Sequence, residues 1–489
     1  MKKKSLYTAV CILIACCCTA VAKDRTVNIK LDKTYAARSD AYQELYRPQF
    51  HFSPQTGWLN DPNGLVYYKG EYHLYYQAWP NDVQARGKIW SHAVSKDLIH
   101  WTQIDHALIN EGNRMIFSGS ALVDHNNTAG LQKGKNKALI AIYTLTKPHV
   151  QCIAWSLDRG RTFTKYKEPV VGTLTEKNRD PKVFWYEPDQ KWIMVLYLGE
   201  RTKFVLLGSK DLKKWDKLSD LEIPDGHECP EMFEMHVDGN KNKKRWVAMD
   251  GQELYMVGQF DGEKFIPDTK NAFRSEWGHN GKAGQAWNDT PDGRIVFILW
   301  MKAKMGARVG GTVKEVYPGM GFSQQMSVPR ELTLRTTSEG LRLYSWPVKE
   351  IERLRGKGET QSDTALKPGM NALSSVTGEL FDIETEIEPG RAKKIVLGIR
   401  GIPITWDPAA RTLSCLGAKA EISPEYRKLK LRVLVDRTSM EIFACDGRYV
   451  MSFCFTPEPG NTNLSLIAQD GEAKIKSLKV WPLGSIWKR

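Results

Sequence analysis

One short pattern recurs four times between residues 95 and 265, and it constrains the fold more than any other feature. Each copy places an Asp a few residues before an aromatic residue, as in SKDLIHW, SLDRGRTF, SKDLKKW and FDGEKF. The aspartates are Asp97, Asp158, Asp211 and Asp261, so successive copies lie 61, 53 and 50 residues apart. Repeats of about 40–50 residues are typical of the four-stranded blades of β-propellers. The repeat therefore predicts a propeller in which each copy belongs to a different blade.

The sequence between the copies predicts strands. LIAIYTL, KWIMVLYLG, KFVLLGS and RIVFILWM are strand-sized runs bounded by Gly, Pro, Asn and Asp. LVYYKGEYHLYYQ predicts a hairpin with Lys69 and Gly70 at its tip. Strands without intervening helices favour a sandwich, a barrel or a propeller, and the repeat selects the propeller. About 300 residues at this spacing would form five or six blades. We expect five, over residues 47–345.

The pattern changes beyond residue 345. PVKEIERLR, from Pro347 to Arg355, predicts a short helix inside a linker that spans residues 346–362. Further on, LFDIETEIE, KLRVLVDRTSMEIFAC and YVMSFCF alternate apolar and polar residues, which indicates half-buried antiparallel strands. We therefore expect a β-sandwich over residues 363–489. The predicted fold class is all-β, a five-bladed β-propeller with a C-terminal β-sandwich.

The N-terminus predicts export from the cytoplasm. Residues 1–22, MKKKSLYTAVCILIACCCTAVA, combine a Lys-rich start, an apolar stretch and small residues, and are too short to be a spanning helix with flanks. Two processing sites compete. Ordinary cleavage would follow Ala22, whereas LIAC resembles a bacterial lipobox in which Cys16 would carry a lipid that anchors the chain to a membrane. Residues 23–46 would form an N-terminal segment of a periplasmic, cell-surface or secreted protein.

Composition excludes several classes of protein. The net charge is +14, but Lys and Arg are spread along the whole chain and not gathered in stripes, so we expect no nucleic-acid partner. The 42% of hydrophobic residues, with 16 Trp and 18 Tyr, suffices for a buried core. The cysteines beyond residue 22 show no paired CxxC spacing, so we expect no zinc site.

Three carboxylates each lie beside Pro or turn residues at the edge of a predicted strand. Asp61 lies in WLNDPNG, whose composition predicts a turn, Asp180 lies in KNRDPKVFW and Glu228 in HECPEMF. They come from different parts of the repeat, so a propeller would bring them to one central funnel. Glycoside cleavage needs one ionised and one protonated carboxyl group. Two nearby anions raise the pKa of a third carboxyl group, and the adjacent Arg179 favours the ionised form of Asp180. We therefore expect Asp61 and Asp180 to be ionised and Glu228 to be protonated.

WLNDPNG, RDPKVFW and ECPEMF resemble the three signature motifs of glycoside hydrolase family 32, the β-fructofuranosidases that include invertases, inulinases and levanases. YHLYYQ, FSGSA, QQMSVPRELTL and LVDRTSMEIF resemble further blocks of that family in the right order, across nearly the whole chain beyond residue 22. The family's fold, a five-bladed propeller with a C-terminal β-sandwich, agrees with the pattern above. The resemblance implies a retaining, exo-acting hydrolase that releases fructose from levan, inulin or sucrose, with no cofactor and no metal.

The resemblance also implies residue roles. Asp61 would be the nucleophile, Glu228 the general acid/base and Asp180 a transition-state stabiliser that holds sugar hydroxyls. Glu231, three residues after Glu228, would lie on the opposite face of an extended segment. Seven further positions match residues that line the fructose pocket of the family: Asn60, Gln77, Trp90, Phe117, Ser118, Arg179 and Trp300.

Two stretches depart from the family pattern. The family usually has Gly where this chain has Ser91, and the segment His279-Asn280-Gly281-Lys282 replaces an acidic or Tyr-bearing loop. We expect both to shape the rim of the pocket, which leaves the preference for β-2,6 or β-2,1 linkages open.

Three alternatives remain at the level of sequence. A related inverting five-bladed propeller glycosidase would use Asp61 as a base with a wider separation of carboxyl groups. A fructosyltransferase would pass the same covalent intermediate to a sugar instead of water. A non-catalytic fructan-binding protein would be expected to lose at least one of the three carboxylates, and all three are present.

Overall fold

The computed structural model describes residues 41–303, 307–308, 311–312 and 317–487. The predicted export signal with Cys16, and most of the N-terminal segment that we expected to follow it, lie outside these residues. The described chain is built from strands, with three short 3-10 helices: η1 (Glu187–Asp189), η2 (Lys349–Leu354) and η3 (Cys445–Gly447). Over the same residues, no helix has the length and apolar character needed to cross a membrane.

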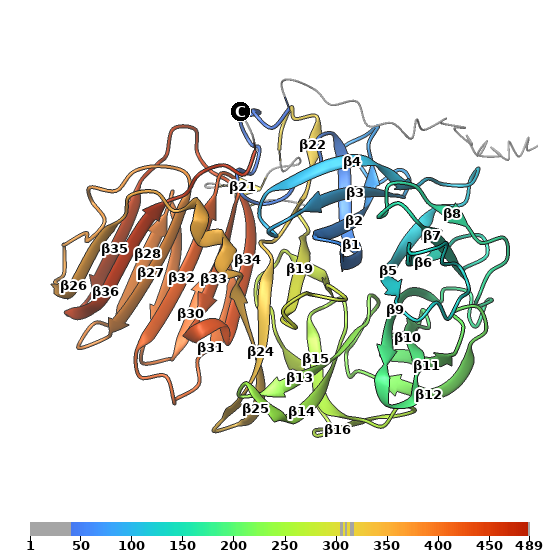
Figure 1. Cartoon of the computed structure of the whole chain (residues 1–489). Helices are drawn as coiled ribbons and strands as arrows, with labels where there is room; N and C mark the ends of the chain where they lie inside the picture. Colours follow the sequence, from blue (N-terminus) through green and yellow to red (C-terminus); the bar gives the residue numbers. More distant parts are fainter. Residues whose placement is uncertain (1–40, 304–306, 309–310, 313–316, 488–489) are drawn as a thin grey trace, which may run out of the picture. The chain divides into compact units, whose positions relative to one another are not determined.

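Five antiparallel sets of four strands follow one another along the chain and form the blades of a propeller (Figure 1). Blade 1 contains β1 (Gly57–Tyr68), β2 (Glu71–Trp79), β3 (Ile89–Ser95) and β4 (Trp101–Leu108). Blade 2 contains β5 (Ile116–Asp124), β6 (Ala138–Leu145), β7 (Val150–Ser156) and β8 (Thr164–Lys165). Blade 3 contains β9 (Arg179–Tyr186), β10 (Lys191–Tyr197), β11 (Lys203–Ser209) and β12 (Asp216–Glu222).

The last two blades are joined into one sheet by a parallel pairing between β13 and β24. Blade 4 contains β13 (Glu231–Val237), β14 (Asn240–Met249), β15 (Leu254–Phe260) and β16 (Phe265–Pro267). Blade 5 contains β18 (Gly281–Ala286), β19 (Ile295–Met301), β24 (Arg330–Thr337) and β25 (Gly340–Pro347). Short strands lie beside these blades: β17 (Phe273–Arg274) on β15, β22 (Phe322–Ser323) on β1 and β23 (Gln325–Met326) on β19.

The repeated Asp occupies the same place in each of the first four blades, the turn between the third and fourth strands. In every copy the carboxylate accepts hydrogen bonds from two backbone N–H groups, two to four residues further along the chain. A short carboxylate that satisfies backbone donors in this way fixes a tight turn. The repeat thus has a structural cause, and the assignment of one copy to each blade is confirmed.

Successive blades pack face to face, and this explains the continuous apolar runs in the sequence. In β10, Trp192 and Met194 enter the core between blades 2 and 3, while Ile193 and Val195 enter the core between blades 3 and 4. Successive side chains of a strand point to opposite faces. A strand that is buried on both faces therefore needs apolar residues at consecutive positions, whereas a half-buried strand needs them only at alternate positions.

Side chains that cross the centre of the propeller connect its inner strands. Asn288 Nδ2 donates to Ala121 O at 2.7 Å and to Val183 O at 3.1 Å, and Gln285 Nε2 donates to Gly119 O at 3.0 Å. The buried Lys182 ammonium donates to Ala286 O and lies 2.9 Å from Glu231 Oε2. These contacts join β5, β9, β13 and β18, and they fix the positions of the strands that carry the site.

The C-terminal part is a sandwich of two sheets (Figure 1). A cluster of apolar side chains buried between the sheets forms its core. The larger sheet has the order β21 (Gly311–Thr312), β20 (Ala307–Arg308), β34 (Tyr449–Thr456), β33 (Ser439–Ala444), β32 (Leu429–Asp436), β27 (Phe381–Glu388), β36 (Ala473–Pro482) and β26 (Glu359–Leu366). The smaller sheet has the order β31 (Ala418–Glu421), β30 (Thr412–Cys415), β29 (Ile402–Asp407), β28 (Lys394–Ile399) and β35 (Leu464–Gln469).

The expected fold class, a five-bladed propeller with a C-terminal sandwich, is confirmed. The segment expected as a helical linker is more structured than its sequence indicated. It contains the end of β25, the 3-10 helix η2 and the first residues of β26, which pairs with β36.

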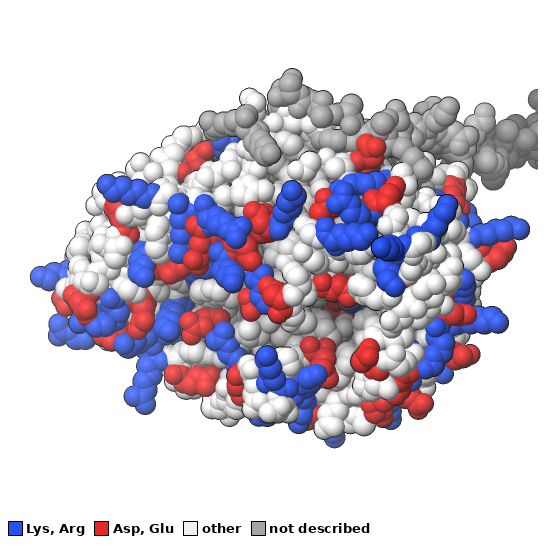
Figure 2. All heavy atoms as spheres, in the orientation of Figure 1, with Lys and Arg blue, Asp and Glu red and all other residues white. Residues whose placement is uncertain are grey.

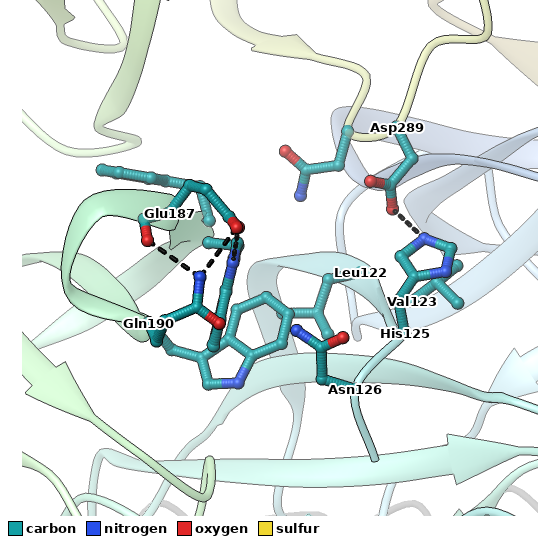
Figure 3. A pocket seen from close by; sticks show the side chains of 11 residues that line it. Leu122, Val123, His125, Asn126, Glu187, Gln190 and Asp289 are labelled. Carbon is teal, nitrogen blue, oxygen red and sulfur yellow. Dashed lines mark hydrogen bonds and ion pairs between the residues drawn. The ribbon is translucent and has the colours of Figure 1, made fainter. Parts of the chain in front are cut away.

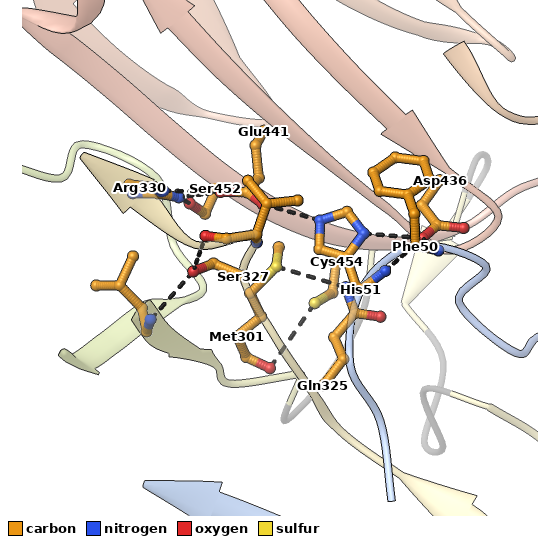
Figure 4. A network of polar contacts seen from close by, with 12 residues as sticks. Phe50, His51, Met301, Gln325, Ser327, Arg330, Asp436, Glu441, Ser452 and Cys454 are labelled. Carbon is orange, nitrogen blue, oxygen red and sulfur yellow. Dashed lines mark hydrogen bonds and ion pairs between the residues drawn. The ribbon is translucent and has the colours of Figure 1, made fainter. Parts of the chain in front are cut away.

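A buried network of charged groups joins the propeller to the sandwich (Figure 4). The His51 ring lies between Asp436 and Glu441 of the sandwich, with 2.8 Å from each ring nitrogen to a carboxylate oxygen. The backbone N–H of Gln49 and His51 donate to Asp436 as well. Arg330 of blade 5 donates to Glu441 at 2.9 Å through Nε. Every member is satisfied by a partner of opposite charge, which is the condition under which burial of charge is tolerated.

We expect His51 to make the stability of the protein depend on pH. Burial alone would lower the pKa of His51, but its hydrogen bonds to Asp436 and Glu441 prevail and raise it to about 9, from 6.5. The stabilisation is therefore complete below about pH 6.5 and is lost as the pH rises through 9, at about 1.4 kcal/mol per pH unit in that window. His51→Gln should destabilise the protein by about 3–5 kcal/mol at neutral pH and should abolish this pH dependence.

Thermal unfolding between pH 6 and 10 measures both effects. His100→Gln is the matched control, since His100 is an exposed residue that pairs with Asp97 on the surface. An unchanged alkaline loss of stability in His51→Gln would show that another group is responsible.

Candidate active site

A β-bulge at the start of β1 holds Asp61. Leu59 pairs with Ala78 and Pro62 with Tyr76, so Asn60 and Asp61 together face the single residue Gln77. The sequence WLNDPNG predicted a turn, and that prediction is wrong, because the segment remains part of a strand. Bulges and turns use the same residues, since both need local bending and unpaired backbone groups. The bulge re-aims the Asp61 side chain without ending the strand.

The inner strands of blades 2 and 3 begin with bulges of the same kind. In β5, Phe117 and Ser118 face the single residue Thr144. In β9, Asp180 and Pro181 lie opposite one residue between Val195 and Tyr197. Inner strands of successive blades contact each other, so three bulges at equivalent places bring these side chains together. Because the sequences of the three bulges differ, this shared feature could not be predicted from them.

Hydrogen bonds from blades 1 and 2 fix the Asp61 carboxylate. Ser118 Oγ donates to Asp61 Oδ2 at 2.6 Å, and Asn60 Nδ2 donates to Oδ1 at 3.0 Å. Gln77 Nε2 donates to Ser118 Oγ at 2.8 Å, which orients the hydroxyl toward the carboxylate. Asp61 is therefore held in one orientation by donors from β1 and β5.

Asp180 and Glu228 meet across Arg179. The Arg179 Nη2 donates to Glu228 Oε2 at 2.8 Å, and its Nε lies 3.4 Å from Asp180 Oδ2. The Cys229 N–H donates to Asp180 Oδ2 at 3.2 Å. Asp180, Glu228 and Cys229 have φ angles of 63°, 40° and 44°. Left-handed backbone at non-glycine residues is strained, and such strain is concentrated at functional sites.

Cys229 connects the two aspartates, which completes the cluster. Its Sγ lies 4.0 Å from Asp61 Oδ2 and 3.7 Å from Asp180 Oδ2. Burial, and then the neighbouring Asp180, raise the pKa of the thiol well above its usual value, so it stays protonated. From the sequence, this cysteine was considered only as one of several without paired CxxC spacing. Its position directly after Glu228 was the signal that could have identified it.

The aromatic residues expected around the pocket have unequal positions. Trp90 is completely buried, and its indole N–H donates to Phe117 O at 2.9 Å, so it supports the β5 bulge from behind. Trp300 is partly exposed, packs edge-to-face on Trp58 at 6.3 Å and donates to Gln324. Lys88 lies 4.5 Å from the centre of the Phe117 ring. Lys88 lies in none of the quoted motifs, and Trp58 begins WLNDPNG but was not among the residues expected to line the pocket.

The pKa shifts of the three carboxyl groups are opposite to the protonation pattern that the sequence indicated. Burial of Asp180 raises its pKa to about 7, because the nearby Arg179 only partly compensates. Burial also raises the pKa of Asp61. Burial opposes ionisation of Glu228 too, but the hydrogen bond from Arg179 prevails and lowers its pKa. Arg179 adjoins Asp180 in sequence, yet it donates to Glu228 in space. The first proton taken up by the cluster thus goes to an aspartate.

Glu228 and Glu231 differ sharply in environment. Glu228 precedes β13 and its side chain is 37% exposed, whereas Glu231 is 1% exposed and pairs with Lys182. Only Glu228 can reach a bound molecule.

Of the two departures from the family pattern, Ser91 is buried inside blade 1, contrary to the expectation that it shapes the rim, whereas Lys282 lies opposite Trp300 in the sheet. Ser91 is buried in β3, where its hydroxyl contacts His106 Nδ1 at 2.8 Å. His279 Nε2 lies 3.1 Å from Leu416 O, and Asn280 Oδ1 accepts from the N–H of Cys454 at 3.0 Å. His279 and Asn280 therefore hold blade 5 against the sandwich. Lys282 donates to Gln252.

Comparisons with known proteins agree with this geometry. The model for the glycosyl hydrolases family 32 N-terminal domain matches residues 51–347, and the model for the family's C-terminal domain matches residues 350–482. A levanase from Bacillus subtilis is 38% identical over 92% of this chain and 72% of its own length. An extracellular exo-inulinase from Aspergillus niger is 28% identical over 91% of this chain and 96% of its own.

Solved structures give the same result. The exo-inulinase from Aspergillus awamori superposes with a TM-score of 0.83 at 27% identity, over 91% of this chain and all of that structure. A fructofuranosidase from Schwanniomyces occidentalis, solved in complex with fructosylnystose, superposes with a TM-score of 0.80 at 27% identity, over 93% of this chain and all of that one. Two family models that together cover most of the chain, and a relative at 38% identity, show that this protein belongs to glycosyl hydrolases family 32.

Proposed function

We propose that the protein hydrolyses β-fructosides from the chain end and releases fructose with retention of configuration. The convergence of Asp61, Asp180 and Glu228 on one site, in a chain that shares its family with levanases, exo-inulinases and invertases, supports this proposal. Asp61 attacks the anomeric carbon to form a fructosyl ester. Glu228 protonates the leaving oxygen and then takes a proton from the attacking water. Asp180 accepts hydrogen bonds from fructose hydroxyls.

We also propose that Asn60, Gln77, Phe117, Ser118, Arg179 and Trp300 surround the fructosyl unit, and that Trp90 acts through Phe117. The hydrogen bonds at Asp61 support the first part, since Asn60 and Ser118 orient the nucleophile and Gln77 orients Ser118. The burial of Trp90 behind Phe117 supports the second.

Export is proposed on the basis of the N-terminal sequence, and extracellular exo-inulinases among the relatives support it. The mass of the mature N-terminal peptide distinguishes lipidated Cys16 from cleavage after Ala22.

The partners we propose are fructans or sucrose. On the face shown in Figure 2, Lys and Arg alternate with Asp and Glu, without the stripe of one sign that nucleic acid would require.

Product analysis on levan, inulin and sucrose in parallel tests the function. We expect free fructose to be the only early product from at least one polymer, because each catalytic cycle would remove one terminal unit. Oligosaccharides at early times would show endo cleavage, and α-fructofuranose as the first anomer seen by NMR would show inversion. An Asp61→Asn variant should be inactive in all three assays.

Glu228→Gln and Glu231→Gln should fail in different ways. Loss of the proton donor at Glu228 should reduce kcat by about 10²–10⁴-fold and leave the melting temperature near that of the wild type. Loss of the charge at Glu231 leaves the Lys182 ammonium buried without its counter-ion, which should cost about 3–5 kcal/mol of stability. The folded fraction of Glu231→Gln should retain the pH profile of the wild type.

β-Fructosyl fluoride sharpens this comparison, because its leaving group needs no proton. Glu228→Gln should recover the first half-reaction on this substrate only. Greater damage to catalysis in Glu231→Gln than in Glu228→Gln would refute the assignment of the acid.

The fall of kcat/KM at alkaline pH (the alkaline limb) should follow the loss of the last proton from the carboxylate cluster. The pKa of Asp180 is about 7, so the unliganded site loses the proton that Glu228 must deliver as the pH rises through about 7. The Arg179 cation stabilises the ionised form of both groups. Arg179→Met should therefore move the limb to higher pH, besides lowering the rate.

Arg201→Gln is the control for this shift, since Arg201 is an exposed residue beyond the site. A limb that stays in place, or moves to lower pH, in Arg179→Met would contradict this account of the cluster.

A further inference from the structure

A cavity lies where the inner strands β5 and β9 end, whereas the carboxylate site lies where these strands begin. Figure 3 shows the side chains that line the cavity. It has a volume of about 560 Å³, within the range of small-molecule sites. Leu122 and Val123 at the end of β5, and Trp185 near the end of β9, line it. Trp185 lies five residues beyond Asp180 on the same strand, which is about 16 Å along an extended chain. One bound monosaccharide could not touch both sites.

The cavity has a rigid floor and an aromatic wall. Asn288 forms part of the floor, and its amide donates to the backbone of β5 and β9, so it is fixed from two sides. Trp185 and the buried Trp192 pack edge-to-face with ring centres 4.8 Å apart. The Trp185 indole N–H donates to Glu187 Oε2. Trp185 lines the cavity and is partly exposed, so part of an ordered indole ring faces the cavity.

Polar side chains from three blades surround the opening. His125 and Asn126 follow β5, Gln190 follows η1, and Asp289 follows β18. His125 Nε2 lies 3.7 Å from Asp289 Oδ2, and Gln190 Nε2 donates to Glu187 at 2.7 Å. Among the described residues, the Asn126 side chain has no hydrogen-bond partner. The rim therefore offers both donors and acceptors from amides, an imidazole and carboxylates.

This lining selects one class of ligand by its chemistry. Of the described residues that line the cavity, none is Lys or Arg and two are carboxylates, which disfavours phosphates and other anions. The polar rim disfavours a purely apolar ligand, because buried polar groups would lose their hydrogen bonds. A neutral ligand with many hydroxyls satisfies amides and carboxylates together and places its C–H face on an indole ring.

We propose that this cavity is a non-catalytic saccharide subsite, which holds a fructosyl stretch of a fructan polymer while chain ends are cleaved at Asp61. The choice of fructan rests on the proposed function. The subsite raises the occupancy of polymer near the enzyme by a second point of attachment, and it leaves hydrolysis of sucrose, which is too small to span the two sites, unchanged.

Two variants test the subsite in the full-length chain. Asn126→Ala/Gln190→Ala removes hydrogen-bonding groups from the rim, and Trp185→Ala removes the aromatic surface. Each should weaken retardation of the Asp61→Asn enzyme in native gels containing levan or inulin, by about tenfold in apparent Kd. In the active enzyme, each should raise KM for the polymer and leave kcat and KM for sucrose at their wild-type values.

Two controls separate binding from folding. Trp185→Phe keeps an aromatic face and should retain most of the retardation, whereas Asn242→Ala changes an exposed residue of β14 and should have no effect. Unchanged retardation in both test variants, or a parallel loss of sucrose hydrolysis, would overturn the proposal. If the wild type cleaves no fructoside, the proposed function fails, and the gels still show whether the cavity binds levan or inulin.

Discussion

Three carboxylates held within reach of one another repel, and the rest of the site is arranged around that repulsion. The Arg179 cation lies between Asp180 and Glu228, and its shortest hydrogen bond goes to Glu228. Asp61 and Asp180 accept hydrogen bonds from Ser118, Asn60 and the backbone of Cys229. Burial raises the pKa of both aspartates, and repulsion from the neighbouring carboxylates raises it further. The positive charges of Lys88 and Arg179 partly offset this rise in pKa at Asp61 and at Asp180, respectively. A substrate whose hydroxyls donate to Asp180 would lower its pKa, and the proton could then pass to Glu228. On the proposed mechanism, substrate binding would thereby favour protonation of Glu228, the proposed acid.

Such a cluster can persist only on a scaffold that cannot relax away from it. Strained backbone at Asp180, Glu228 and Cys229 is retained because their strands are fixed elsewhere. The blades pack on both faces, and Asn288, Gln285 and Lys182 connect the inner strands across the centre. Active sites commonly reduce the stability of a protein. Here the contacts that fix the inner strands lie only one to three residues beyond Ser118 and Asp180 on the same strands.

Much of this could be predicted from sequence, and the errors have a common physical origin. The repeat of Asp97, Asp158, Asp211 and Asp261 predicted the blades because a carboxylate that fixes a tight turn is a local feature. The hairpin tip at Lys69 and Gly70 was predicted for the same reason, and its φ angles are 47° and 86°. WLNDPNG was misread because bulges and turns share a composition. The partner of Arg179 and the contact of Cys229 with two aspartates depend on contacts between blades. The burial of Ser91 depends on contacts between strands of blade 1. Adjacency in sequence records neither kind of contact.

The family blocks that surround no catalytic residue now have a physical explanation. Arg330 of QQMSVPRELTL, and Asp436 and Glu441 of LVDRTSMEIF, form the buried network with His51 that joins the propeller to the sandwich. Removing one member leaves a charge buried without a partner, so these residues must be kept or lost together. A sequence pattern gives such a block the same weight as the motifs at Asp61 or Glu228. The structure separates the two, because one set converges on an open site and the other is sealed between domains. The resemblance at Asp436 and Glu441 is therefore explained by the assembly of the two domains.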